Sequence, residues 1–130
     1  VRALGISDRV EMVGPRPHDA VLEDLAWADI LLHLSVSEGF GNAVLEAQAM
    51  AIPAVVSDAD GLPENVADGE TGFVVPRRDP DAAARRLAEL VRNPELRLAM
   101  GRAGRCRVEH HFTPQAEISA FEDLYHRVLA

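Results

Sequence analysis

The stretch from residue 30 to residue 57 constrains the fold of this chain more than any other part of the sequence. It begins with an apolar run at 30–34 and ends with a second at 53–57, and both runs predict buried strands. Between them lie a turn that contains Gly39 and Gly41 and an alanine-rich segment with helical periodicity. The order of strand, turn, helix and strand predicts a unit in which the two strands run parallel.

The turn in this unit carries residues that suit a phosphorylated sugar. Its glycines let backbone N–H groups come close to a ligand, and the start of the following helix offers free N–H groups and the positive end of a dipole. Glu38 and Glu46 bracket this region with seven residues between them. A carboxylate beside an anion site is unfavourable unless it binds hydroxyl groups. The set therefore predicts a site for a phosphate that is joined to a sugar.

Strands and helices alternate along the rest of the 130 residues, without internal repeats. Further strands are expected at 10–13 and 72–76, and helices at 20–28, 63–67, 95–109 and 115–129, with one more directly after 79. Three helix starts pair a capping side chain with a following proline, at Asp79, Asn93 and Thr113. This alternation predicts an α/β fold with a Rossmann-like parallel sheet, helices on both faces, and ligands beyond the carboxyl ends of the strands.

The periodicity also predicts which side chains are buried. Trp27 is expected to anchor the helix at 20–28 in the core. The last helix is expected to bury five side chains: Ile118, Phe121, Leu124, Tyr125 and Val128. Gly101 and Gly104 are expected to weaken the helix at 95–109, because glycine has a poor helix propensity.

Three motifs, in this order along the chain, resemble one enzyme family. Residues 38–46 read Glu-x7-Glu with Gly-Phe-Gly after the first glutamate, 61–66 read Gly-x-Pro-Glu-x-Val, and 68–76 read Asp-Gly-x-Thr-Gly-x-x-x-Pro. Together they resemble the retaining glycosyltransferases of family four, which belong to the group 1 glycosyl transferases and have the GT-B fold. The resemblance runs from about residue 10 to residue 125.

The resemblance implies a role for each residue of the glycine turn. Glu38 would bind hydroxyls of the donor sugar, and Glu46 the ribose hydroxyls of the nucleotide. The backbone N–H groups that would face the sugar and the distal phosphate belong to Gly39, Phe40, Gly41 and Asn42. Glu38 is the residue assigned to the catalytic site, in a positioning and electrostatic role and not as a general base. The mechanism usually proposed for the family is front-face attack, with no metal and no cofactor besides the donor substrate.

The resemblance also implies that part of the enzyme lies outside this sequence. Residues 1–130 match the later part of a C-terminal domain and are expected to be a partial nucleotide-sugar-binding domain. Two strands, an Arg-x4-Lys pair that neutralises the diphosphate, and the N-terminal domain that binds a carbohydrate or lipid-linked acceptor are missing. The chain alone is therefore expected to lack transferase activity. The strand at 10–13 is expected to pair directly with the strand at 30–34 or, as the less favoured choice, with another copy.

The chain departs from the family pattern at four positions. Leu34 stands in place of the usual proline, Gln48 in place of methionine and Ala51 in place of glycine. Asp60 replaces the first glycine of a common Gly-Gly pair, so the loop at 58–61 is expected to differ and the donor preference stays open.

Charge and composition argue against other kinds of partner. With 21 acidic and 13 basic residues, a net charge of −8 disfavours binding of nucleic acid through bulk charge. The single cysteine, Cys106, excludes an internal disulfide and is expected to be semi-buried. The histidines, His33 among them, do not converge in the sequence, so no metal site is predicted. No segment reaches the length of a membrane span, so a cytoplasmic location is expected, or one peripheral to the inner membrane in the full-length protein.

Two other classes of protein remain as alternatives to a hexosyltransferase. A sugar-nucleotide epimerase can have the same fold but lacks the Glu-x7-Glu spacing. A non-catalytic, receiver-like interaction domain needs clustered acids after its first strand and a late lysine, and this sequence contains no such lysine. Product analysis with a labelled donor distinguishes the two enzymes, and phosphorylation by a small phosphodonor identifies the receiver.

Overall fold

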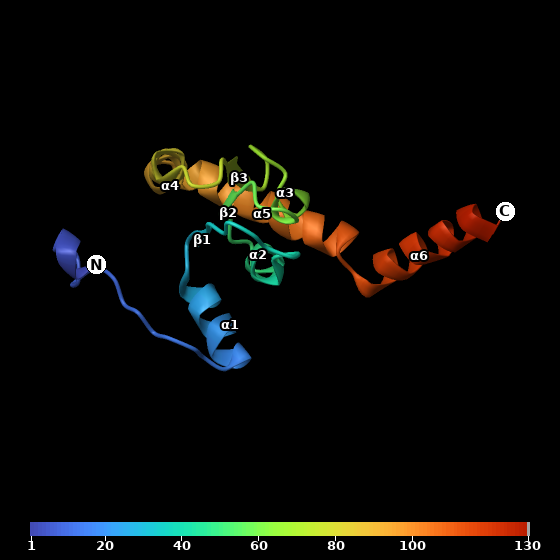
Figure 1. The fold of residues 1–130 in the computed structure, drawn as a ribbon, viewed down its shortest axis with the longest axis horizontal. Coiled ribbons are helices and arrows are strands. Elements are labelled where there is room, and N and C mark those ends of the chain that lie inside the picture. The colour runs from blue at the N-terminus through green and yellow to red at the C-terminus, as the bar shows by residue number, and fades with distance from the viewer. Residues whose placement is uncertain (130) are drawn as a thin grey trace.

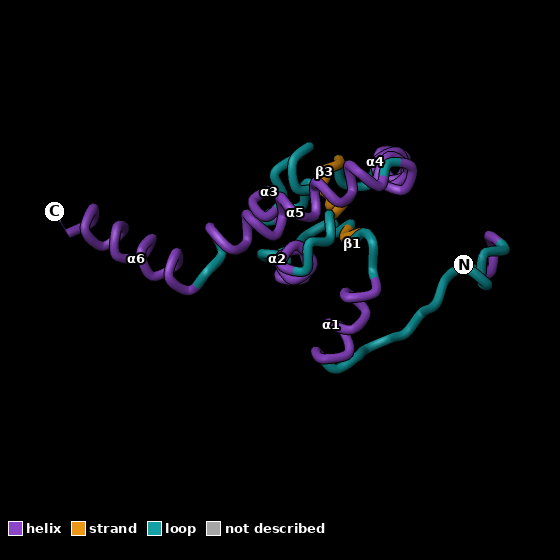
Figure 2. Tube along the Cα trace, turned by 180° about the vertical axis from the view of Figure 1, so that it is seen from behind, coloured by secondary structure: helices purple, strands orange, loops and turns teal. Residues whose placement is uncertain are grey.

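The structure is a computed structural model that describes residues 1–129. Its elements are, in chain order, η1 (Arg2–Leu4), α1 (His18–Trp27), β1 (Leu31–His33), α2 (Asn42–Ala49), β2 (Ala54–Ser57), α3 (Leu62–Asn65), β3 (Gly72–Val75), α4 (Pro80–Arg92), α5 (Pro94–His111) and α6 (Pro114–Leu129). The elements from β1 to α5 gather into one body, from which the segment before α1 and helix α6 extend in opposite directions (Figures 1 and 2). No helix within residues 1–129 is both long and apolar enough to cross a membrane.

The sheet has three parallel strands in the order β1-β2-β3. Leu31 pairs with Ala54, and Ala54 pairs with Gly72 on its other side. All four residues of β2 are buried, as expected for the central strand of a parallel sheet. A side chain at Gly72 would overlap the carbonyl oxygen of Ala54, so glycine is required where β3 joins the sheet.

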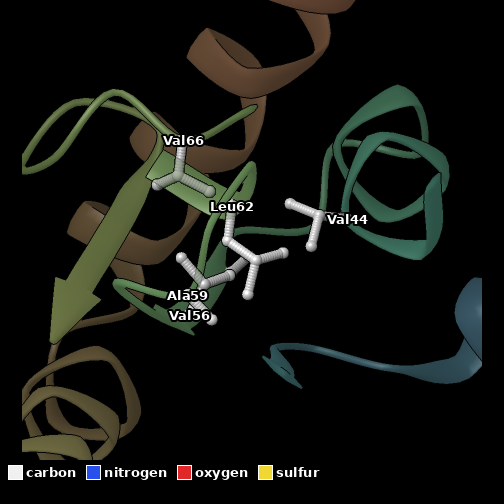
Figure 3. Packing of buried hydrophobic residues seen from close by; sticks show 6 residues of the cluster. Val44, Val56, Ala59, Leu62 and Val66 are labelled. Carbon is white, nitrogen blue, oxygen red and sulfur yellow. The ribbon is translucent and has the colours of Figure 1, made fainter. Parts of the chain in front are cut away.

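Helices cover both faces of the sheet, which confirms the predicted α/β architecture. Successive residues of a strand point to opposite faces, so Val55 and Val56 of β2 enter different cores. The core around α2 and α3 contains Val44, Ala54, Val56, Ala59, Leu62 and Val66 (Figure 3). The core under α4 and α5 contains Val55, Phe73, Val75, Ala83, Leu90 and Met100.

All three predicted helix caps are confirmed. The side chain of Asp79 accepts a hydrogen bond from the N–H of Ala82 at 2.8 Å, at the start of α4. Asn93 accepts one from Leu96 at 3.0 Å, at the start of α5. Thr113 Oγ1 likewise accepts one, at 3.1 Å, from the third residue of α6. Each cap satisfies an N–H group that has no partner inside its own helix.

Gly101 and Gly104, which are expected to weaken α5, are contact positions in an uninterrupted helix. Both glycines are buried where α5 packs on α2. A Cβ at Gly101 would overlap the carbonyl oxygen of Ala51, and one at Gly104 would lie 3.1 Å from Cγ of Gln48. The absence of side chains therefore lets α5 approach α2 and the turn after it closely.

The predicted strand at 10–13 is wrong. These residues form no regular structure, and Val10, Met12 and Val13 are exposed. The expected direct pairing with the strand at 30–34 is also wrong, because β1 pairs only with β2 in the described sheet. An extended segment without a neighbouring strand has no partners for its backbone groups, so it gains nothing from β conformation.

Several burial predictions are also wrong. Trp27 is 88% exposed, because α1 packs through Leu25 and Val21 against Ala47. All five side chains expected to be buried by α6 are exposed, since this helix stands away from the body (Figure 1). Cys106, expected to be semi-buried, is exposed. Leu32, in the strand expected to be buried, is half-exposed because β1 lies at the edge of the described sheet. Helical periodicity identifies an apolar face, but burial needs a partner for that face.

Candidate functional site

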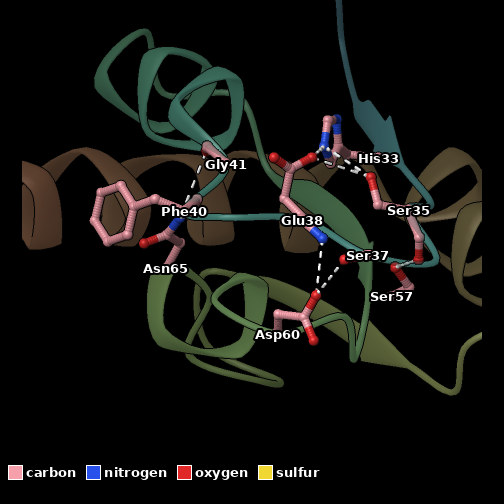
Figure 4. Close-up of polar contacts among 9 residues, drawn as sticks. All are labelled: His33, Ser35, Ser37, Glu38, Phe40, Gly41, Ser57, Asp60 and Asn65. Atoms are coloured by element: carbon pink, nitrogen blue, oxygen red, sulfur yellow. Dashed lines mark hydrogen bonds and ion pairs between the residues drawn. The ribbon is translucent and has the colours of Figure 1, made fainter.

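The carboxyl ends of β1 and β2 lie side by side, because neighbouring parallel strands end at the same edge of a sheet. His33, the last residue of β1, pairs with Val56, and Ser57 ends β2. The hydroxyl of Ser57 donates to the carbonyl oxygen of Ser35 at 2.6 Å. The turn after β1 therefore meets the loop after β2 at this edge (Figure 4).

Gly41 determines how α2 begins at this edge. It is the N-cap residue, is buried, and has a left-handed conformation with φ of 80°. A Cβ here would lie 2.5 Å from Cδ2 of Leu62. No side chain caps the first N–H groups of α2, and its first turn holds no acidic residue. The helix start therefore retains free N–H groups and the positive end of its dipole, which suit an anion.

Asn65 holds the glycine turn from inside the protein. Its side chain is fully buried, and its Nδ2 donates to the carbonyl oxygens of Phe40 and Gly41, the second at 3.5 Å (Figure 4). Gly61 adds a backbone contact, since a Cβ there would overlap the carbonyl oxygen of Gly39. The carbonyl groups of Phe40 and Gly41 therefore point into the protein, toward α3.

Glu38 is the partly buried carboxylate of the site. Its Oε2 accepts a hydrogen bond from His33 Nε2 at 2.8 Å and another from Ser35 Oγ at 3.1 Å. The hydrogen bond from His33, followed by that from Ser35, holds the pKa of the Glu38 carboxyl below its ordinary value. About a quarter of each side chain is exposed, 26% for His33 and 28% for Glu38, so the pair remains open to a ligand.

Asp60 ties the loop after β2 to the same turn. Its Oδ2 accepts from the backbone N–H of Glu38 at 3.0 Å and from Ser37 Oγ at 2.9 Å, while Arg77 Nη1 lies 3.6 Å from its Oδ1. The hydrogen bond from the Glu38 N–H, followed by that from Ser37, lowers the pKa of the Asp60 carboxyl. The aspartate that departs from the family pattern therefore has a defined structural role.

The residues predicted from the motif lie together, apart from Glu46. Glu38, Gly39, Phe40 and Gly41 form the turn, and Asn42 is the first residue of α2. Glu46 follows one helical turn later and is half-buried. The Phe40 ring is 44% exposed, and its centroid lies 6.1 Å from that of Phe112. A Cβ at Gly39 would meet no atom within 4 Å, so this side of the turn is open.

Four residues that contact the turn are not predicted from the sequence: His33, Ser35, Asp60 and Asn65. A polar residue at the last position of an apolar strand was the available signal for His33, because such strand ends line ligand sites. In the part of the chain that the structure describes, no three side chains of His, Cys, Asp or Glu gather into a possible metal site.

Known proteins with similar sequences point to one family. The family model of the glycosyl transferases group 1 matches residues 1–107. N-acetyl-alpha-D-glucosaminyl L-malate synthase of Bacillus anthracis is 35% identical over 129 residues, which make up 99% of this chain and 33% of that protein. D-inositol 3-phosphate glycosyltransferase of Corynebacterium efficiens is 37% identical over 124 residues, or 94% of this chain and 28% of that protein. The chain thus spans about a third of the length of these relatives.

Solved structures agree with this relationship. Sucrose-phosphate synthase from Thermosynechococcus elongatus has a TM-score of 0.86 at 29% identity, with 98% of this chain and 32% of that chain covered. HepE from Anabaena, solved in complex with UDP and glucose, has a TM-score of 0.85 at 22% identity. The match covers 96% of this chain and 34% of that chain, and at this identity it supports only the fold. Sequence and fold together show that this chain belongs to the glycosyl transferases group 1 and shares the α/β fold of their GT-B structures.

Proposed function

We propose that this chain is the nucleotide-sugar-binding part of an enzyme that transfers a hexosyl group from a nucleotide-diphosphate sugar to an acceptor, with retention of anomeric configuration. One observation carries the proposal: the Glu38 side chain lies beside Gly41 at the uncapped start of α2. A Cβ on Gly41 would lie 3.7 Å from Cγ of Glu38. A carboxylate so close to an anion site suits a single ligand that contains both hydroxyl groups and phosphate.

The proposed roles are those that the family resemblance implies, and the positions of the groups support them. The N–H groups at 39–42 would bind the distal phosphate and the sugar, and Glu38 would accept hydrogen bonds from sugar hydroxyls. Glu46 lies one turn further along α2 and would bind the ribose hydroxyls. A carboxylate that accepts two hydroxyl hydrogen bonds orients its ligand strongly, because charged acceptors form the stronger bonds.

The names of the relatives support a sugar donor without identifying it. One relative is named as a D-inositol 3-phosphate glycosyltransferase and another as an N-acetyl-alpha-D-glucosaminyl L-malate synthase. One structure of the same fold was solved with UDP and glucose. We therefore propose a nucleotide-diphosphate hexose as donor and leave its base and its sugar to experiment.

Retention is proposed through attack on the same face of the sugar from which the diphosphate leaves. The acceptor oxygen forms a bond to the anomeric carbon while the bond from that carbon to the diphosphate oxygen breaks. A phosphate oxygen of the donor accepts the proton of the acceptor hydroxyl. The N–H groups and dipole of α2 would stabilise the developing charge on the diphosphate, and Glu38 would orient the sugar. We propose no metal and no further cofactor for this reaction.

The test uses the full-length protein that contains this sequence. A thermal-shift panel of UDP-, GDP- and ADP-hexoses identifies the donor, and NMR of the product then gives its anomeric configuration. Transfer with retention is the expected result. Conversion of the donor to an isomeric nucleotide sugar without transfer would instead identify an epimerase, and an inverted product would refute the same-face mechanism.

We also expect residues 1–130 alone to show no transferase activity and only weak donor binding. The acceptor would be bound by a domain that this sequence does not contain, and the diphosphate would rely on backbone N–H groups alone. Calorimetry of the isolated chain with the donor found in the panel tests this expectation. Binding in the micromolar range or tighter would contradict it.

A further inference from the structure

Within residues 1–129, the two side-chain hydrogen bonds to the Glu38 carboxylate both go to the same oxygen. His33 Nε2 and Ser35 Oγ both bond to Oε2, at 2.8 Å and 3.1 Å. Ser35 Oγ also lies 3.3 Å from His33 Nε2, so the three side chains form one cluster. The other carboxylate oxygen, Oε1, points away from His33 (Figure 4).

We propose, on the basis of the proposed function, that His33 and Ser35 are positioning residues that hold Oε2 of Glu38 and so present Oε1 to one hydroxyl of the donor sugar. A glutamate in a turn would otherwise sample many rotamers, and ordering it on binding would cost conformational entropy. Two hydrogen bonds to one oxygen select a single orientation before the donor arrives. They also leave Oε1, the carboxylate oxygen that faces away from the cluster, to accept a hydrogen bond from the ligand.

The cluster is tied to the sheet at two points, His33 and Ser35. His33 belongs to β1 and is in register with Val56 of the central strand β2. The carbonyl of Ser35 accepts the Ser57 hydroxyl at 2.6 Å, which ties the first residues of the turn to the end of β2. Side chains that orient a binding group act best from such rigid elements.

The surrounding charges are separate from this cluster. Asp60 bonds to the backbone N–H of Glu38, not to its carboxylate, and Arg77 lies beside Asp60 at 3.6 Å. Replacing His33 or Ser35 removes a hydrogen bond that keeps the pKa of Glu38 low, and neither Asp60 nor Arg77 is among the groups that shift this pKa. The acid limb of kcat/KM should therefore move to higher pH in these variants, since Glu38 would be protonated more easily.

The experiment compares His33→Leu, His33→Gln and Ser35→Ala in the full-length protein, with Glu38→Gln as the reference for the loss of the site. His126→Gln, which changes an exposed histidine on α6, is the matched control. We expect His33→Leu to lower kcat/KM for the donor roughly tenfold, the size of effect that loss of one hydrogen bond to a charged group produces. Ser35→Ala should act in the same direction, and His33→Gln, whose amide can still donate, should recover part of the loss.

The outcomes separate this inference from the proposed function. If His33→Leu and Ser35→Ala both keep kcat/KM within about twofold and an unmoved acid limb while Glu38→Gln is impaired, the positioning role is refuted and the donor site stands. If Glu38→Gln retains full transfer activity, the role of Glu38 in the donor site and the positioning role both fail, while the proposed transfer reaction stands. Should His33→Leu not fold, the Ser35→Ala and His33→Gln profiles decide the question by the same criteria, with thermal unfolding as the check on their folding.

Discussion

The backbone N–H of Glu38 donates a hydrogen bond to Oδ2 of Asp60 at 3.0 Å, although the two residues belong to loops that follow different strands. Asp60 has φ of 43°, a left-handed conformation that is uncommon outside glycine. This conformation brings its carboxylate to the point where the glycine turn begins. The loop after β2 therefore sets the position of the turn after β1, through a residue at which the family pattern has glycine.

The first prediction concerns stability in acid. The hydrogen bonds that lower the pKa of Asp60 favour the folded state when the carboxylate is charged, so their stabilisation is present above the ordinary pKa of 3.8. It is lost as the pH falls through the lower pKa of the folded state. Asp60→Asn does not titrate, so its thermal unfolding midpoint should fall less than that of the wild type between about pH 4 and pH 2.

Asp123→Asn on α6 is the control for this experiment, because it removes an exposed aspartate far from the turn. The thermal unfolding midpoint of this variant should change with pH in the same way as that of the wild type. An identical acid dependence of the Asp60→Asn variant and the wild type would show that the Asp60 contacts do not stabilise the fold.

The second prediction distinguishes the two glycines of the turn. Gly41→Ala should destabilise the protein by about 1–3 kcal/mol, because φ of 80° is strained for alanine and its Cβ would meet Leu62. Gly41→Val should also abolish donor binding, since its side chain would displace the start of α2. Gly39→Ala is the matched control and should unfold near the wild-type temperature, because no atom lies within 4 Å of its Cβ. Unchanged donor affinity of Gly41→Val by calorimetry would mean that the turn is only structural.

The third prediction tests the two carboxylates as ligands of the donor. Glu38→Gln and Glu46→Gln should each lower kcat/KM roughly ten- to a hundredfold in the full-length protein, as expected for loss of a charged hydrogen-bond acceptor. The thermal unfolding midpoint should change little, since both side chains are only partly buried. Glu122→Gln on α6 is the control and should be fully active. Near wild-type kinetics in both variants would refute the site assignment.

The fourth prediction concerns the contact between α5 and the turn that follows α2. In an ordinary helix, replacing glycine by alanine stabilises by about 1 kcal/mol. Gly101→Ala should instead destabilise by about 1–3 kcal/mol, because the added Cβ would overlap the carbonyl oxygen of Ala51. Ala99→Gly, at an exposed position of the same helix, measures the effect of helix propensity on stability without a change in packing. A higher unfolding midpoint for Gly101→Ala would show that the two helices can separate at low cost.

Local chemistry made much of the fold predictable from the sequence. The side chains of Asp79, Asn93 and Thr113 cap helices through N–H groups three residues ahead, so each signal lies within a few positions. The glycine turn with Glu38 and the apolar run of β2 could also be recognised, because the residues that mark each of them are consecutive in the chain.

Only the tertiary structure decided which apolar faces are covered and which polar groups meet. The apolar face of α6 and the ring of Trp27 are exposed, because no element of residues 1–129 covers them. The contact from Asp60 to Glu38 joins residues 22 positions apart, and the one from Asn65 to Phe40 spans 25 positions. Such contacts arise because parallel strands bring their carboxyl ends to one edge of the sheet, so the pairing of β1 with β2 determined them.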